Sequence, residues 1–235
     1  MKVDVLGFTP RGAKQVSEKH TRGPVLIKLY HEYLQTEDSA SFILAVSQRY
    51  TLGTLHRLAQ SGGRIERRAS VMAIGFLGED ESCRVLSRAL ADADRGVRML
   101  ADNGIRAVWC RGGNETQRHW LRVIMRLNVS GQYEAAQRQA TRLVREAPRF
   151  AEAWNQRAVA RYHLSCYMDS IEDCTQALKL NPYHFGAAAG IGQCYLRLGA
   201  LTTALQSFRR ALRLNPGLEA VRAKITTLQR ALGER

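Results

Sequence analysis

The hexapeptide ALKLNP at residues 177–182 returns as ALRLNP at residues 211–216, 34 residues further along the chain. A third proline, Pro148, lies 34 residues before Pro182 and ends the related stretch TRLVREAP. Because a proline ring cannot continue the hydrogen-bond ladder of an α-helix, each proline marks a helix end. The spacing therefore predicts three copies of one unit, each closed by a helix that a proline terminates.

Each copy contains two amphipathic helices, because apolar residues recur three and four positions apart on both sides of a short polar break. Small residues recur where the two helices must approach closely, at Ala158 and Gly192 in the first helices and at Ala136, Ala177, Ala204 and Ala211 in the second. Large residues fill the space between them, at Trp154, Tyr195 and Phe208. This pattern predicts a repeated helical hairpin, whose apolar face is buried only when neighbouring hairpins stack.

These residues resemble the tetratricopeptide repeat. The third copy, residues 185–218, matches through Gly192, Tyr195, Gly199, Ala204, Phe208, Ala211 and Pro216. The second, residues 151–184, keeps Trp154, Ala158, Ala177 and Pro182 but departs at Arg161, Ser170 and Cys174. The first, residues 117–150, keeps Trp120, Gly131, Tyr133, Ala136 and Pro148, with Ile124 and Leu143 at places that are small in the family. The resemblance implies that residues 218–232 form a capping helix.

A second internal repeat, of about 31 residues, comes earlier in the chain. RRASVMAIGFLG (67–78) aligns with RMLADNGIRAVW (98–109), and each follows a shorter helical stretch, TLGTLHRLA (51–59) or CRVLSRALA (83–91). VLIKLYHEYL (25–34) and SASFILAVSQRY (39–50) are expected to form the first two helices. Across roughly residues 36–111 the run DADRGVRMLA (92–101) resembles HEAT-like repeats of the phycobilisome-lyase type, although Gly63 and Glu66 replace the Asp and Val of that motif. The resemblance implies further stacked helix pairs.

The boundary between the two repeat types is expected at Gly112 and Gly113, followed by a capping box of Asn114 and Gln117. The expected fold is all-α, a right-handed α-solenoid of HEAT-like repeats, three tetratricopeptide-like repeats and a cap. Its parts are an extended or disordered lead-in at residues 1–24, HEAT-like repeats at 25–113 and tetratricopeptide-like repeats at 114–235.

The chain has 35 Lys and Arg residues against 21 Asp and Glu, a net charge of +14. This balance favours acidic partners and leaves nucleic acid or another polyanion as the alternative ligand. The basic residues are spread along every predicted helix, which is more typical of solvated helix faces. We therefore expect a protein or peptide partner ahead of nucleic acid, and no membrane partner.

The cysteines and the first residues bear on location. Cys83, Cys110, Cys166, Cys174 and Cys194 form no CxxC pair and are expected to be buried thiols, which fits a reducing compartment. The stretch MKVDVLGFTPRGAK lacks the apolar run of a secretory signal, and no stretch approaches the ~18 apolar residues of a membrane span. These features predict a cytoplasmic protein.

The sequence offers no catalytic, metal or cofactor site. GAAAGIGQC (186–194) follows no predicted strand and precedes no Lys-Ser/Thr, so a phosphate loop is not expected. No two histidines are spaced as in a metalloprotease helix, and Asp169, Glu172 and Asp173 are expected on an exposed face without a basic partner. Arg67 and Arg98 with Asp92 and Asp94 form either an anion-binding edge or an ion-pair ladder between repeats, and we favour the ladder. We predict a protein that is not an enzyme.

The concave groove of the stacked hairpins is the predicted binding site. Its inward face is expected to carry Leu121, Met125, Asn128, Asn155, Val159, Tyr162, His163, Ala189, Gln193, Leu196 and Arg197. Asn and Gln side chains can pair with a peptide backbone, and Tyr162 offers a flat amphipathic contact. Some tetratricopeptide domains hold the C-terminal carboxylate of a chaperone tail. The matching positions here are Leu121, Met125, Gln156, Gly186 and Gly190, so such a clamp is not expected. The predicted function is a non-catalytic peptide-binding scaffold, and a bare spacer is the plain alternative.

Overall fold

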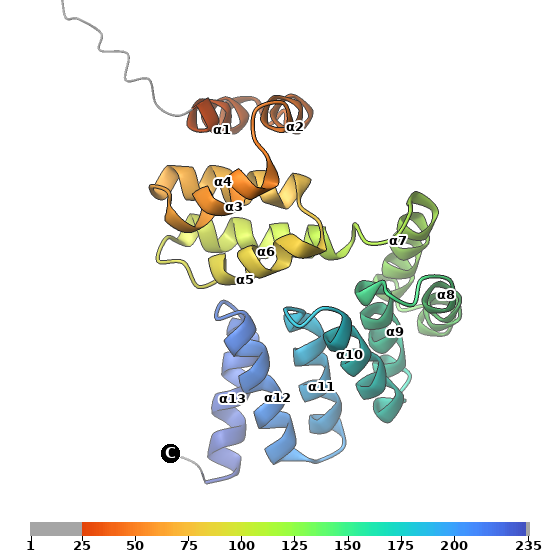
Figure 1. Ribbon diagram of the computed structural model, residues 1–235. Coiled ribbons are helices and arrows are strands. Elements are labelled where there is room, and N and C mark those ends of the chain that lie inside the picture. Colours follow the sequence, from red (N-terminus) through yellow and green to blue (C-terminus); the bar gives the residue numbers. More distant parts are fainter. Residues whose placement is uncertain (1–24, 234–235) are drawn as a thin grey trace, which may run out of the picture.

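The computed structural model describes residues 25–233, and this part of the chain is all-helical (Figure 1). The predicted lead-in at residues 1–24 lies outside the described residues. The elements are α1 (Val25–Thr36), α2 (Ser39–Ser47), α3 (Leu52–Ser61), α4 (Arg64–Leu77), the 3₁₀ turn η1 (Asp80–Ser82), α5 (Cys83–Ala89), α6 (Arg95–Trp109), α7 (Glu115–Val129), α8 (Tyr133–Glu146), α9 (Ala151–His163), α10 (Tyr167–Leu180), α11 (Phe185–Arg197), α12 (Leu201–Leu214) and α13 (Glu219–Ala231). The all-α prediction is confirmed.

Several helices begin where a side chain caps them, as local sequence rules require. Thr51, Asp94 and Asn114 each accept a hydrogen bond from a backbone amide three residues on. The predicted capping box is confirmed, because the Gln117 side chain also accepts a hydrogen bond from the Asn114 amide at 2.9 Å. The helix start that the sequence marked at Asn114 is therefore the observed one.

The first six helices, α1–α6, share one core and are called here the N-terminal block. Fully buried Leu26, Leu55, Ile74 and Ile105 contribute to that core from four different helices. Helices α4 and α6 approach very closely, because a Cβ added to Gly75 would come within 3.0 Å of the Cα of Gly104.

Helices α7–α13 form the C-terminal block, in which the pairs α7/α8, α9/α10 and α11/α12 are hairpins and α13 follows. The prolines Pro148, Pro182 and Pro216 all lie just beyond the second helix of a pair. Gly192 is the small residue that the packing needs, since a Cβ there would lie 2.7 Å from the ring of Phe208. The expected hairpin register is thus the observed one.

The C-terminal block folds back beneath the N-terminal block instead of extending it (Figure 1). At Gly113 the backbone adopts φ +70°, a left-handed value that suits glycine, and α7 leaves in a new direction from α6. The turns before α11 and α13 then reach the N-terminal block. Phe185, at the start of α11, lies in the core of α1–α6, and Leu218 packs against the same core. The predicted helices are correct, but they form two arrays that meet.

Two asparagines of the repeated hexapeptides make this contact. The Asn215 side chain donates to Asp102 Oδ1 at 2.7 Å, and the Asn181 side chain donates to the sulfur of Cys83 at 3.5 Å. Each also accepts a backbone hydrogen bond two residues on, which shapes its turn. The first copy has Ala147 in this place, so it has no side-chain amide with which to make the same bond.

Candidate functional site: the groove between α9, α10 and α11

A hollow of about 260 Å³ opens between the helices α9, α10 and α11. It is lined by Asn155, Ala158, Val159, Tyr162, His163, Ser170, Cys174, Gly186, Ala189, Gly190 and Gln193. The structure therefore brings together six residues of the predicted groove face, namely Asn155, Val159, Tyr162, His163, Ala189 and Gln193. These six come from the second and third repeats, and the predicted residues of the first repeat are not among them.

The predicted residues of α7 lie elsewhere. Leu121 is fully buried in the core of α7–α9, and Met125 packs against the same core. Asn128 is buried, and its amide nitrogen donates to both the backbone and the side-chain oxygen of Gln156. The inward placement of Leu121 and Asn128 was wrong because α7 turns this face toward α9, which covers it.

Aromatic side chains gather where α8 begins and α9 ends, and two of them, Tyr162 and His163, line the groove. The rings of Tyr133 and His163 stack with centroids 4.2 Å apart, and Tyr162 meets His163 edge to face. Arg197 donates through Nε to the Tyr167 hydroxyl at 3.1 Å and lies over that ring. Arg197 is thus held against Tyr167 and is not among the residues that line the hollow. Leu196 packs against the core of α9–α13.

The opposite wall is nearly bare, because Gly186, Ala189 and Gly190 expose little side chain there. Behind them, burial raises the pKa of the Cys174 thiol far above its ordinary value, so this thiol stays protonated. The Ser170 hydroxyl donates to the Ala158 carbonyl at 2.8 Å. The groove therefore offers shape, amides and aromatic faces, and it offers no activated nucleophile among the residues that line it.

A buried polar cluster at the base of α9 was not anticipated from the sequence. The Glu152 carboxylate lies 2.7 Å from Nε2 of His184 and accepts further hydrogen bonds from Asn155 and Gln156. Nδ1 of His184 accepts the amide of Ala187, so Nε2 carries the proton that faces Glu152. Burial by itself raises the pKa of Glu152, but these hydrogen bonds outweigh it and hold the pKa below its ordinary value.

This cluster supports the fold and has no access to a substrate, since His184 is 0% exposed. Asn155 lines the groove and also donates one hydrogen bond to Glu152. A signal was available in the sequence, because His184 falls two residues after a helix-ending proline, where a side chain can cap the next helix.

The expectation for Asp173 was wrong. Asp173 is 1% exposed and receives a two-bond fork from Arg157, at 2.8 and 2.6 Å, while Arg161 lies 2.9 Å from the same carboxylate. Asp169 and Glu172 are exposed as predicted. Ser170, Asp173 and Ala177 are three and four positions apart, which places all three on the inner face of α10. This spacing could have predicted that Asp173 is buried.

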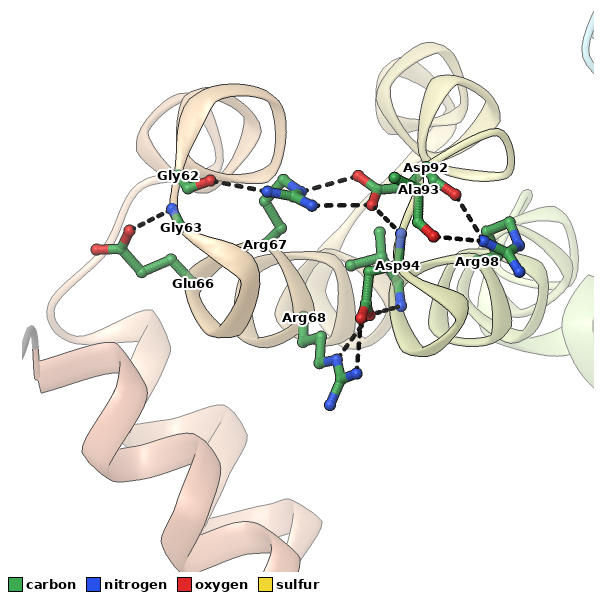
Figure 2. A network of polar contacts seen from close by, with 10 residues as sticks. Gly62, Gly63, Glu66, Arg67, Arg68, Asp92, Ala93, Asp94 and Arg98 are labelled. Carbon is green, nitrogen blue, oxygen red and sulfur yellow. Dashed lines mark hydrogen bonds and ion pairs between the residues drawn. The ribbon is translucent and has the colours of Figure 1, made fainter.

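The Asp–Arg ladder is present with one change of partner (Figure 2). Arg67 forms a two-bond fork with Asp92, at 2.8 and 3.0 Å, as favoured from the sequence. Asp94 pairs with Arg68 and not with Arg98, at 2.7 Å for both bonds. Arg98 instead donates to the backbone carbonyls of Asp92 and Ala93. In the first copy of the 31-residue repeat, Gly63 has no side chain to cap α4, and Glu66 accepts the Gly63 amide at 2.6 Å.

The cysteines differ in exposure. Cys83, Cys174 and Cys194 are buried and Cys110 is half-buried, but Cys166 is exposed because it precedes α10 at a turn. The burial expected for Cys166 was therefore wrong. Within residues 25–233, no group of three His, Cys, Asp or Glu side chains is arranged to hold a metal ion. In the same part of the chain, none of the helices has the length and apolar character needed to cross a membrane.

Two protein-family models match part of the C-terminal block. Residues 151–184 match one family model for the tetratricopeptide repeat, and residues 129–167 match a second model for the same repeat. The chain therefore contains tetratricopeptide repeats. The first of these matches coincides with the second copy of the 34-residue unit defined from the prolines.

Curated relatives match about a third of the chain. Superkiller complex protein 3 of Homo sapiens is 32% identical over 82 residues, which is 35% of this chain and 5% of that protein. A TPR repeat-containing protein of Rhizobium etli is 28% identical over 85 residues, which is 36% of this chain and 42% of that protein. The chain thus spans less than half the length of these relatives.

Solved structures of tetratricopeptide proteins match different parts of the chain. The first TPR of Spaghetti (RPAP3) bound to an HSP90 peptide has 20% identity and a TM-score of 0.49, covering 52% of this chain and 97% of that one. A thermophilic TPR protein of Thermus thermophilus has 18% identity and a TM-score of 0.38, covering 87% of this chain and 95% of that one.

Proposed function

We propose that this protein is a non-catalytic interaction scaffold that binds an extended peptide segment in the groove between α9, α10 and α11. The observation that carries the proposal is the hollow of about 260 Å³ in which Asn155, Tyr162 and His163 of α9 face a wall of small residues on α11, with Gln193 on the same helix as that wall. Such a wall lets a peptide backbone approach closely, and the amides of Asn155 across from it and of Gln193 beside it can pair with that backbone.

The groove defines the chemistry of the expected peptide. An aromatic rim of Tyr133, Tyr162 and His163 favours an apolar or aromatic side chain that stacks on it. None of the residues lining the hollow is acidic. Arg197 bonds to Tyr167, whose ring contacts that of the lining residue Tyr162, so acidic residues flanking the apolar anchor favour association. A chaperone-type carboxylate clamp is not part of the proposal, because Leu121 is core and Gln156 bonds to Glu152 and Asn128.

A peptide-display selection against the full chain tests the proposal. Selected peptides are titrated against the protein, and affinity is compared between two variants that add the same bulk. Ala189→Leu fills the groove, and Ala223→Leu adds the same side chain to an exposed position of α13. We expect Ala189→Leu to weaken binding at least about tenfold, because the isobutyl side chain of leucine occupies the peptide's place. We expect Ala223→Leu to leave binding unchanged.

Tyr162→Ala provides a second, subtractive test of the same groove. It removes a half-buried ring that borders the hollow, and we expect weaker peptide binding with little change in thermal unfolding. Equal affinity of both leucine variants and of Tyr162→Ala would refute the groove. Selection of no peptide, together with an RNA affinity that falls steeply with salt, would favour the polyanion alternative instead.

A further inference from the structure

The fold-back creates a second hollow, of about 880 Å³, between the two blocks. Helix α6 of the N-terminal block forms one side of it, and the turn from α12 into α13 forms the other. Arg95, Arg98, Arg222 and Glu219 all line this cleft. Its size lies within the ~300–1,000 Å³ of small-molecule sites, and its walls belong to two parts of the chain that meet only after folding.

The ladder of Figure 2 shows what Arg98 has in common with Arg67 and where the two differ. Each donates Nη1 to the carbonyl five residues before it, Gly62 at 3.1 Å and Ala93 at 2.9 Å. The rest of the Arg67 fork, Nε and Nη2, binds the Asp92 carboxylate of the next repeat. The array ends after α6, so no next repeat supplies a carboxylate to Arg98.

Arg98 is consequently a positioned guanidinium whose Nε and Nη2 donors are unused. Only its Nη1 bonds to other described residues, and that bond to two carbonyls fixes where the plane of the group lies. Nε and Nη2 remain as a parallel pair of donors, the arrangement that binds a carboxylate or phosphate through two bonds. The equivalent pair on Arg67 already holds an oxyanion in this structure.

Neighbouring charges in the cleft strengthen this preference. Two of its carboxylates are already paired, Asp92 with Arg67 and Asp102 with Arg106. Glu219 is the remaining carboxylate among the residues that line it, against three arginines, Arg95, Arg98 and Arg222. No side chain caps the N-terminus of α13, which also borders the cleft, so its backbone dipole adds positive potential there.

We propose that this cleft is a binding site for a small molecule that carries two or more phosphate groups. One phosphate takes the place on Arg98 that Asp92 occupies on Arg67, and a second lies between Arg95 and Arg222. The ligand then contacts both blocks, so its binding stabilises their docking. The site is separate from the peptide groove and does not depend on it.

Calorimetric titration of the full chain with pyrophosphate, ATP and adenosine tests the proposal at low salt. We expect pyrophosphate and ATP to bind and to raise the temperature of thermal unfolding, and adenosine to do neither. Binding of both phosphate compounds with similar affinity indicates that the phosphates alone are recognised. Tighter binding of ATP indicates that the cleft also holds a nucleoside.

Two variants and one matched control locate the site. Arg98→Ala removes the fork, and Arg95→Ala combined with Arg222→Ala removes two exposed arginines that the fold does not bury. We expect each to weaken pyrophosphate binding at least about tenfold. Arg84→Ala combined with Arg138→Ala removes the same charge from exposed positions outside the cleft and should leave binding unchanged.

Three results would overturn the assignment. They are an absence of binding by pyrophosphate and ATP, equal weakening by the control pair, and binding restricted to an acidic peptide that competes for the same arginines. Arg98→Ala also removes two bonds to the backbone, and Arg222→Ala removes one, to the Pro216 carbonyl. Arg95→Ala alone therefore decides the outcome if either of those variants unfolds.

Discussion

The indole of Trp109 at the end of α6 stacks on the imidazole of His184 at the start of α11, with ring centroids 4.0 Å apart and ring planes 12° apart. The two residues belong to different blocks, and both are buried. His184 in turn bonds to Glu152 and caps α11. One stacked pair therefore links the docking of the blocks to the internal hydrogen bonds of the second and third repeats.

Removal of the Trp109 indole should weaken the packing between the two blocks. We expect Trp109→Ala to lower the free energy of unfolding by about 3–5 kcal/mol, because a buried ring is replaced by a cavity between the blocks. Small-angle scattering should show a larger radius of gyration if the blocks separate. Trp120→Ala is the control, since Trp120 packs within α7–α9 and should leave the radius unchanged.

The buried carboxylate of Glu152 should make stability depend on pH. Its pKa in the folded protein is below the ordinary value of 4.5, so its ionisation contributes stability in full above about pH 4.5, and this contribution is lost as the pH falls through the folded pKa. Glu152→Gln should destabilise by about 1–3 kcal/mol at pH 7, because three donors surround the carboxylate and an amide nitrogen meets them as a further donor. The difference between wild type and variant should shrink in chemical denaturation below pH 4.5. A difference that is constant with pH would contradict an ionised Glu152.

Because Asp173 is buried and Asp169 is exposed, substitution of the two residues should change stability by different amounts. Asp173→Ala leaves Arg157 buried without its carboxylate and should cost about 3–5 kcal/mol in chemical denaturation. Asp169→Ala, on the exposed face of α10, should change the unfolding free energy by less than about 0.5 kcal/mol. Similar effects for the two variants would show that the Arg157–Asp173 pair does not support the fold.

Two glycines in helices should respond in opposite directions to the same substitution. Gly75→Ala places a methyl group 3.0 Å from the Cα of Gly104, so we expect it to push α4 and α6 apart and destabilise the protein. Gly53→Ala in α3 meets nothing closer than 3.9 Å and should stabilise by up to about 1 kcal/mol through helix propensity. Thermal unfolding of the two variants checks both signs.

The groove could be predicted only in part. For α9 and α11 the hairpin register placed Asn155, Val159, Tyr162, His163, Ala189 and Gln193 on one surface, and these six residues line one hollow. For α7 the same rule failed, because α9 packs over the face that carries Leu121 and Asn128. A repeat pattern gives the direction of a side chain on its own helix, but the neighbouring helix decides whether that direction leads to solvent.

The sequence alone determined the helices, their caps and the pairing of α7 through α12 into hairpins, because these follow from apolar periods, prolines and capping side chains within a few residues of each other. Tertiary structure decided that the two arrays meet. That contact depends on the backbone direction at Gly113 and on the summed rotation of successive hairpins, which no local pattern records. The asparagines of ALKLNP and ALRLNP show the difference, since their positions beside helix-ending prolines are local facts. Their bonds to Cys83 and Asp102 exist only because the chain folds back.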